Sequence, residues 1–467
     1  MIASLDDHVD GQGIVIVDGG SEAEVDSGPT LPPGCDGALD PKSAPCQVAN
    51  ETGVFVSPQG VDTQPGTRQA PLHTITAGIK KVLSRQAETG QRLVGVFVCE
   101  GAYTEALAMK GAGQGVSVFG GFSCAADWAH TGASSTVKPA EKGYALRVEG
   151  IPTRTMFQDL VLEVAPVDQP GESSVVAFAV ESSVDFKRVV LIAGDGATGA
   201  DGAPFTGDGN KYPNNSDGYN ATAAPLTPGG SNTCNCPKGG TSNGGFGNMG
   251  AAANQAGGGG GVAQSPADPT GDTGVGATAS CSTPPMRGSR GQARPQGLAA
   301  GLGALTTAGW EPASGTEGAV GGAAQGGGGG GGGGIGAGGG GGCGGCGGAG
   351  GNGGRGGGAS IGILLLNSKA TFSYCRIKLG RGGAGGGGGN GQDGLAGGKG
   401  GTPAGTGGCA GAPGGTGAGG NGGDGGSGGI AVAIVRRAGP PPKWGKDTPI
   451  EVPNNAQDLD DQIELGF

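Results

Sequence analysis

The sequence has few aromatic residues and few basic ones, and each shortage excludes a class of protein. Aromatic residues make up 4% of the 467 positions, so a core can form only where the aliphatic residues gather. Lys and Arg number 28 against 39 Asp and Glu, and the resulting net charge of -11 argues against a nucleic-acid-binding protein. No apolar run approaches the roughly 18 residues that a membrane span needs.

The acidic residues concentrate at the two ends of the chain. Residues 1–52 carry ten Asp or Glu against the single Lys42, and six more acids follow from Asp447 onward with no base. Such charge runs are typical of solvated tails. We therefore expect 1–52 to be a leader rich in Pro, Gly and acid that cannot fold alone. It contains no recognisable secretory signal, and we expect one to be missing from this sequence.

Short apolar runs bounded by turn residues predict an all-β protein. Runs of Val, Ile, Leu and Phe lie between Gly53 and Gly194, at 360–379 and at 430–435. Helical spacing is convincing only over 74–86, where the apolar positions are Ile75, Ile79, Val82 and Leu83.

Three segments within residues 53–128 carry a family resemblance. They read VFVSPQGVDTQPGT with APLHTI, then GVFVCEGAYTEAL, then VSVFGGFSCAADW. This order resembles the opening of secreted bacterial right-handed parallel β-helix proteins of the pectate-lyase-like type. The resemblance implies a coil of parallel strands with the helix capping one end. It implies no activity, because many members of that group have no known catalysis.

An internal repeat supports a coil of stacked units. FQDLVL at Phe157, FKRVVL at Phe186 and FSYCRI at Phe372 share a Phe before a largely apolar stretch, and IAVAIV from Ile430 resembles a further copy. We therefore expect a short right-handed parallel β-helix interrupted by two inserts. The expected parts are a leader (1–52), the coil with its cap helix (53–193), a first insert (194–359), one rung (360–379), a second insert (380–429), and final strands with an acidic tail (430–467).

Glycine, with 115 residues, fills the inserts at a period of three. Every third residue is Gly over 327–357, 382–400 and 405–429. Mobile loops are one interpretation. The other, which we favour, is a bundle of extended threefold helices of the polyglycine II type, whose side-chain-free edges let backbones pair. Collagen does not fit, because these blocks contain almost no proline.

The inserts should also lie together. Both leave the repeat at the same point, so we expect them side by side on one face of the coil. An unbroken helix over 327–357 would exceed the width of the coil, so this run should fold back on itself. In the last block, Asn421, Asp424 and Ser427 would share one edge of such a helix.

Eleven cysteines predict disulfides and an extracellular protein. Cys35 and Cys46 could close a short loop, and Cys99 and Cys124 end neighbouring strand-like segments. Four more would cross-link the inserts, or alternatively hold zinc: Cys234, Cys236, Cys343 and Cys346. Because the count is odd, one thiol is left free or pairs between chains.

No residue set predicts catalysis. No cofactor is expected, and calcium is possible. Asp195, Asp201 and Asp424 are the calcium candidates, although isolated carboxylates supply few of the ligands that calcium needs. Charged residues beside the repeated Phe are expected to form a solvated outer face; they are Asp159, Asp185, Lys187 and Arg188. The three histidines, His8, His73 and His130, have no nucleophile at a recognisable spacing.

These features predict a secreted or surface-attached structural or adhesive protein, not an enzyme. Its partner would be a copy of itself, with open strand edges stacking into fibres, or a surface ligand such as a polysaccharide. A polysaccharide-lyase-like β-helix enzyme is the alternative from another class. Ice binding is a third alternative, suggested only by the glycine period. In composition that period resembles two proteins with polyglycine II bundles, a glycine-rich insect antifreeze protein and a phage tail adhesin tip.

Overall fold

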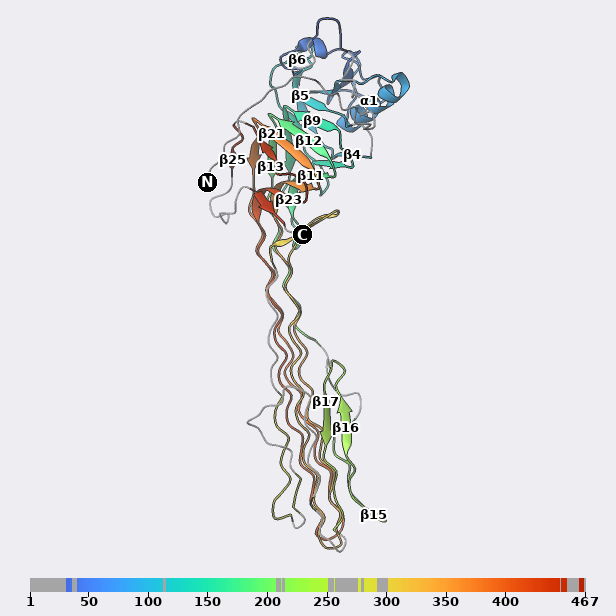
Figure 1. Cartoon of the computed structure of the whole chain (residues 1–467), viewed down its shortest axis with the longest axis vertical. Coiled ribbons are helices and arrows are strands. Elements are labelled where there is room, and N and C mark those ends of the chain that lie inside the picture. Colours follow the sequence, from blue (N-terminus) through green and yellow to red (C-terminus); the bar gives the residue numbers. More distant parts are fainter. Residues whose placement is uncertain are drawn as a thin grey trace, which may run out of the picture.

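The chain forms a head of parallel β-sheets and a long stalk of glycine-rich segments that projects from one end of the head (Figure 1). Within the residues described below, the fold is all-β apart from one α-helix and one 3₁₀ turn, η1 (Pro45–Gln47), which confirms the expected class. The computed structural model describes residues 31–35, 40–111, 115–206, 211, 215–250, 256, 276–278, 281–291, 301–445, 447–451 and 462–465.

Three parallel sheets make up the head, and successive strands visit them in rotation. Sheet A contains β1 (Gly53–Val56), β2 (Gly95–Cys99), β5 (Val118–Ser123), β9 (Arg154–Gln158), β12 (Ser183–Lys187), β21 (Lys369–Ser373) and β24 (Lys443–Trp444), with β6 (Ala129–His130) antiparallel to β5. Sheet B contains β3 (Gly101–Tyr103), β7 (Ser135–Val137), β10 (Leu160–Val164), β13 (Val190–Ala193), β22 (Arg376–Lys378) and β25 (Ile450–Glu451). Sheet C contains β4 (Leu107–Lys110), β8 (Leu146–Glu149), β11 (Ser174–Val180), β20 (Ser360–Leu366), β23 (Ala431–Arg437) and β26 (Gln462–Glu464).

The repeated Phe occupies equivalent places in neighbouring strands of sheet A. Phe157 pairs with Phe186, and Phe186 pairs with Phe372. Their ring centroids are 5.7 and 5.3 Å apart, and Trp444 continues the stack 5.0 Å beyond Phe372. The repeat in the sequence is therefore a stack of rungs, in which each rung buries its apolar face against the next.

Three successive turns from sheet A to sheet B use a residue with left-handed backbone. Asp159, Arg188 and Tyr374 follow β9, β12 and β21 with φ of 53°, 54° and 56°. Side chains other than glycine seldom adopt this conformation. Backbone hydrogen bonds from Asp159 to Lys187 and from Arg188 to Ser373 hold the stacked turns in register. The repeat therefore brings the residue after each such strand to the same corner of the head.

Helix α1 (Ile75–Thr89) covers the first strands of sheet A. It begins after Thr74, whose hydroxyl accepts a hydrogen bond from the Ala77 amide, and it ends at Gly90, which has a φ of 68°. Ile75, Ile79 and Val82 are buried in the core, whereas Leu83 is exposed. The buried stripe is narrower than the expected one, because Leu83 is turned about 100° around the helix from Val82.

The strands β11, β20 and most of β23 in sheet C are buried on both faces. A hairpin of β18 (Gly303–Thr306) and β19 (Gly309–Pro312) places Leu305 and Trp310 against Phe178, Ile361 and Leu364 on its outer side. Strands buried on two faces are near-continuous apolar runs, which explains SVVAFAV and SIGILLL.

The stalk is built mainly from four extended segments, residues 313–333, 336–358, 381–402 and 408–429, joined by backbone hydrogen bonds at every third residue. Every third amide of 313–333 donates to a carbonyl of 336–358, as from Gly318 to Gly351 and from Gly321 to Gly348. The 336–358 segment is central: its amides donate to 408–429, and its carbonyls accept from 381–402. The two glycine-rich stretches therefore lie side by side, and the long run folds back at Gly333–Gly336, as the sequence predicts. The expectation that they lie on one face of the coil is wrong, because they project beyond the head and the width of the coil does not limit their length (Figure 1).

Glycine is required where these segments touch. A Cβ built on Gly348 would lie 1.9 Å from the carbonyl oxygen of Gln392, and one on Gly351 would lie 2.0 Å from that of Gly389. Residues 195–206 and 215–222 run along both 381–402 and 336–358: the Gly199 amide donates to Ala384, and the Arg355 amide donates to Ala200. Two short hairpins complete the part of the stalk far from the head: β14 (Thr222–Ala223) with β15 (Leu226–Thr227), and β16 (Asn232–Asn235) with β17 (Thr241–Gly244).

Candidate functional site

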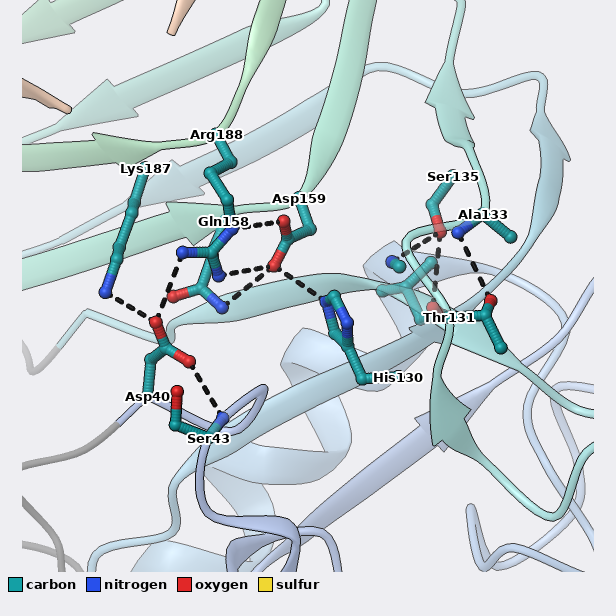
Figure 2. Close-up of polar contacts among 12 residues, drawn as sticks. Asp40, Ser43, His130, Thr131, Ala133, Ser135, Gln158, Asp159, Lys187 and Arg188 are labelled. Atoms are coloured by element: carbon teal, nitrogen blue, oxygen red, sulfur yellow. Dashed lines mark hydrogen bonds and ion pairs between the residues drawn. The ribbon is translucent and has the colours of Figure 1, made fainter. Parts of the chain in front are cut away.

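The most connected polar cluster of the head lies at the corner between sheets A and B (Figure 2). Arg188 donates from Nε to Asp159 Oδ1 (2.6 Å) and from Nη2 to Oδ2 (2.8 Å). His130 Nε2 lies 3.0 Å from Asp159 Oδ2, and Gln158 Nε2 donates to the same oxygen at 2.9 Å. Both oxygens of the Asp159 carboxylate are therefore engaged. The left-handed turns bring Asp159 and Arg188 together, because they occupy the same position in successive rungs.

Asp40 extends the cluster to the leader. Its Oδ2 accepts from Lys187 Nζ at 2.5 Å and from Arg188 Nη1 at 3.2 Å, and its Oδ1 accepts from the Ser43 amide. Asp40 lies inside the loop that the Cys35–Cys46 disulfide closes. The cluster thus ties this loop to two rungs that lie far from it in the sequence.

The expectation of a solvated outer face is wrong for this corner. The Asp159 side chain is 10% exposed and that of Arg188 is 22% exposed. His130 covers Asp159 from β6, and the leader covers Arg188 through Asp40. Val48 of the leader also packs against Phe55 and Phe97 of sheet A. Asp185 is also mostly covered, and it pairs with Arg154.

The charges of the cluster hold one another in the ionised form. Burial would raise the pKa of Asp40, but its hydrogen bonds and its attraction to Lys187 and Arg188 outweigh burial and lower the pKa to about 2. Burial opposes ionisation of Asp159 too, and the bonds from Arg188, His130 and Gln158 nevertheless hold its pKa below the ordinary value. The same two carboxylates raise the pKa of Arg188 against the effect of its burial.

This arrangement is suited to fastening the leader, not to proton transfer. A general base needs a free acceptor within reach of a substrate, and every oxygen of Asp159 is already bonded. Among the described residues, no Ser, Thr or Cys side chain hydrogen-bonds to His130, whose ring instead meets the Phe122 ring edge-on. The amide of His73 donates to Asp62 before α1, and His8 lies outside the described residues.

Five disulfides confirm that the cysteines pair. The stalk is cross-linked twice at neighbouring positions, by Cys234–Cys343 and Cys236–Cys346, so these four residues do not form the zinc site considered as an alternative. Cys281–Cys409 is a further bridge that the sequence did not suggest. Cys375, in the head, is buried and unpaired. The head and leader contain Cys99–Cys124 and Cys35–Cys46.

The calcium candidates are used as hydrogen-bond acceptors within the stalk. Asp195 Oδ1 accepts from the Arg381 amide at 2.6 Å, Asp201 Oδ1 accepts from the Gly387 amide at 2.7 Å, and Asp424 bonds to the Thr316 hydroxyl. The structure does not bring the three carboxylates together. In the part of the chain that the structure describes, no group of three or more His, Cys, Asp or Glu could hold a metal ion.

Two further residues share this bonding pattern, and sequence reasoning missed them. Asp217 accepts from the Lys399 amide and Asn220 from the Thr402 amide, at 2.7 and 2.8 Å. The sequence did contain a signal for them: Asp and Asn residues spaced by a multiple of three within one extended segment lie along the same edge of it. Asp195, Asp201, Asp217 and Asn220 therefore bond to amides along one edge of 381–402.

Comparison of the chain with family models, curated proteins and solved structures finds no match. Among the described residues, no helix is long and apolar enough to cross a membrane.

Proposed function

We propose that this chain is an extracellular structural or adhesive protein, in which a parallel β-helix of the pectate-lyase-like type carries a rigid bundle of polyglycine II helices. The single observation that carries the proposal is the stalk: a long projection that has almost no apolar core and is held by backbone pairing at every third residue. Such a projection is suited to holding one part of a molecule away from another.

Three features support the polyglycine II assignment. The hydrogen bonds join separate segments and recur at intervals of three, as a threefold helix requires. The central segment bonds to neighbours on several sides, unlike a strand in a sheet, which bonds on two. The contact positions are glycines whose Cβ would overlap a neighbouring backbone.

The disulfides support an extracellular location, and the strand edges support self-assembly. Five bridges are expected in an oxidising, extracellular setting. Helix α1 covers the β1 side of sheet A, whereas β24, β25 and β26 are the last described strands at the other end of the three sheets. Edges of this kind can pair with a second copy, so assembly into fibres belongs to the proposal.

The test uses the full-length, disulfide-bonded protein. It is incubated with insoluble polysaccharides, both neutral and acidic, and the protein left in solution is measured. Sedimentation velocity over a range of concentrations reports self-assembly. We expect retention on at least one surface or reversible assembly. A monomer that no surface retains would overturn the proposal, and release of unsaturated sugars from an acidic polysaccharide would replace it with the lyase alternative.

A further inference from the structure

One of the five disulfides, Cys281–Cys409, lies beside the turn at the far end of the stalk. The Cys409 amide donates to Gly331, and the Gly339 amide donates to Cys409. These two glycines lie on either side of the turn Gly333–Gly336, where the long run folds back (Figure 1). Gly339 is three residues from Gly336, so the bridge lies about 10 Å from the turn at ~3.1 Å per residue.

The two cysteines of this bridge differ in their exposure to solvent. Cys281 is exposed, whereas Cys409 is only 5% exposed. The cysteines of the other two stalk bridges are all buried; they are Cys234, Cys236, Cys343 and Cys346. Thiol–disulfide exchange requires that a thiolate reaches one sulfur of the bridge. Among the stalk bridges, a thiolate from solution can therefore reach this one, and it reaches it at Cys281.

The backbone at Cys281 is strained as well as exposed. Its φ is 54°, in the left-handed region that side chains other than glycine seldom adopt. Of the eleven cysteines, all of which the structure describes, it alone has this conformation. Opening the bridge would release Cys281 from one of the contacts that hold it there. Exposed or strained disulfides are the ones that exchange most readily with thiols.

The leader holds the other exposed cysteine, and it provides a comparison. Cys46 is exposed and its partner Cys35 is partly buried. Cys46 lies in η1 without left-handed backbone, and Asp40 fastens the same loop to the head. The two leader cysteines are also only 11 residues apart, so an opened bridge closes again readily. We therefore expect the leader bridge to react more slowly than Cys281–Cys409.

The bundle does not depend on the Cys281–Cys409 bridge for its backbone pairing. Cys409 keeps its two backbone hydrogen bonds when the bridge opens, and the stretch after Cys281 is held separately by the bond from the Gly328 amide to Met286. Two buried bridges cross-link the stalk elsewhere. Reaction at Cys281 would therefore free one thiol without dismantling the stalk.

We propose that Cys281–Cys409 is a thiol-exchange site, through which the far end of the stalk bonds covalently to an accessible thiol of another molecule. The thiolate of that molecule attacks Cys281 Sγ, so a new disulfide forms while the bond to Cys409 breaks. Cys409 leaves as a thiolate and takes up the proton that the attacking thiol lost. The number of disulfides is unchanged, and Cys409 can later attack Cys281 Sγ and release the partner. This site goes beyond the adhesive function proposed above and does not depend on it.

The first experiment uses the unaltered, full-length protein and reduced glutathione at neutral pH. Free thiols are trapped with N-ethylmaleimide at successive times, and the modified cysteines are identified by peptide mapping with mass spectrometry. We expect glutathione on Cys281 and N-ethylmaleimide on Cys409, about tenfold sooner than any modification of Cys35 or Cys46, because the left-handed strain is relieved only at Cys281. The buried stalk cysteines should stay paired. Glutathione on Cys409, or earlier reaction of the leader bridge, would overturn the assignment.

A second experiment asks whether protein thiols react as well as small ones. A folded carrier protein with a single surface cysteine is immobilised, and we measure retention that resists salt but is released by dithiothreitol. The double variant Cys281→Ser with Cys409→Ser should lose this retention, and the matched control, Cys35→Ser with Cys46→Ser, should keep it. Retention that survives loss of Cys281 and Cys409 would overturn the site. Reaction with glutathione but no retention would support the site with small thiols as its partners.

Two measurements keep these outcomes separate from other failures. Amide protection in 411–429 reports whether each variant keeps its bundle; if it is lost, the glutathione experiment on the unaltered protein decides. Retention on polysaccharides and sedimentation of the unaltered protein test the adhesive function independently. Either proposal can therefore fail while the other stands.

Discussion

A single methyl group placed inside the stalk should open it locally. In Gly348→Ala, the new Cβ would lie 1.9 Å from Gln392 O and 2.7 Å from the carbonyl carbon of Gln392. Contacts below 3.0 Å are essentially never seen, and the obstacle is backbone, so the 381–402 segment must move away by roughly 1 Å. The bonds at risk are those from Gln392 to Ala349 and from Leu395 to Cys346, now 2.8 and 3.0 Å long. Losing two backbone hydrogen bonds costs about 2 kcal/mol.

The assay is amide exchange followed residue by residue. A loss of about 2 kcal/mol should speed exchange at Gln392 and Leu395 by roughly 30-fold where exchange follows local opening. Gly428→Ala is the matched control, because nothing lies within 4 Å of a Cβ at that exposed position of the same period. Its effect should stay within about 0.5 kcal/mol. Equal protection of the 381–402 amides in the two variants would refute close backbone packing as the reason for the glycine period.

Three further predictions test the hydrogen bonds, the disulfides and the leader. In 411–429 of the unaltered protein, two backbone amides of every three donate to neighbouring segments and should be protected from exchange. The third should exchange freely; these amides are Thr416, Gly419, Gly422, Gly425 and Gly428. Uniform exchange across 411–429 would contradict the bundle. Replacing Cys236 and Cys346 by Ser should change the melting temperature little, because Cys234–Cys343 closes nearly the same loop. Removing both bridges should cost roughly 5 kcal/mol in chain entropy, and a first removal that costs as much as the second would refute this reasoning. Asp40→Asn should destabilise the head by roughly 1–2 kcal/mol at pH 7 in urea unfolding, because the Asp40 pKa of about 2 lies below its ordinary 3.8. That contribution is complete above the ordinary pKa and disappears as pH falls toward 2, so a difference between the two proteins that is the same at pH 7 and pH 2 would contradict it.

The sequence predicted what depends on periodicity. The Phe repeat located the rungs, since Phe157, Phe186 and Phe372 pair in the expected register. The period of three located the extended segments, because a helix with three residues per turn repeats its contacts at that spacing. Both signals are local, and each can be read without knowing what lies opposite.

Contacts between distant segments gave no such signal. Asp40 lies in a leader that is too polar to fold alone, and its partners Lys187 and Arg188 looked like solvated charges until the leader covered them. The Cys281–Cys409 bridge involves an irregular stretch in which no repeat fixes the position of Cys281. Asp195 and Asp201 were candidates for calcium because sequence alone does not show that backbone amides already occupy their carboxylates.

The triplet contacts also restrict how this protein can change its length during evolution. An insertion of one residue in 336–358 would rotate everything beyond it by a third of a turn and turn side chains into neighbouring backbones. An insertion of three residues would restore the contacts, provided that each neighbouring segment also gained three residues at the same distance from the head. Descendants of this gene should therefore differ in reach by steps of about 9 Å, with matched triplets gained or lost in several segments at once.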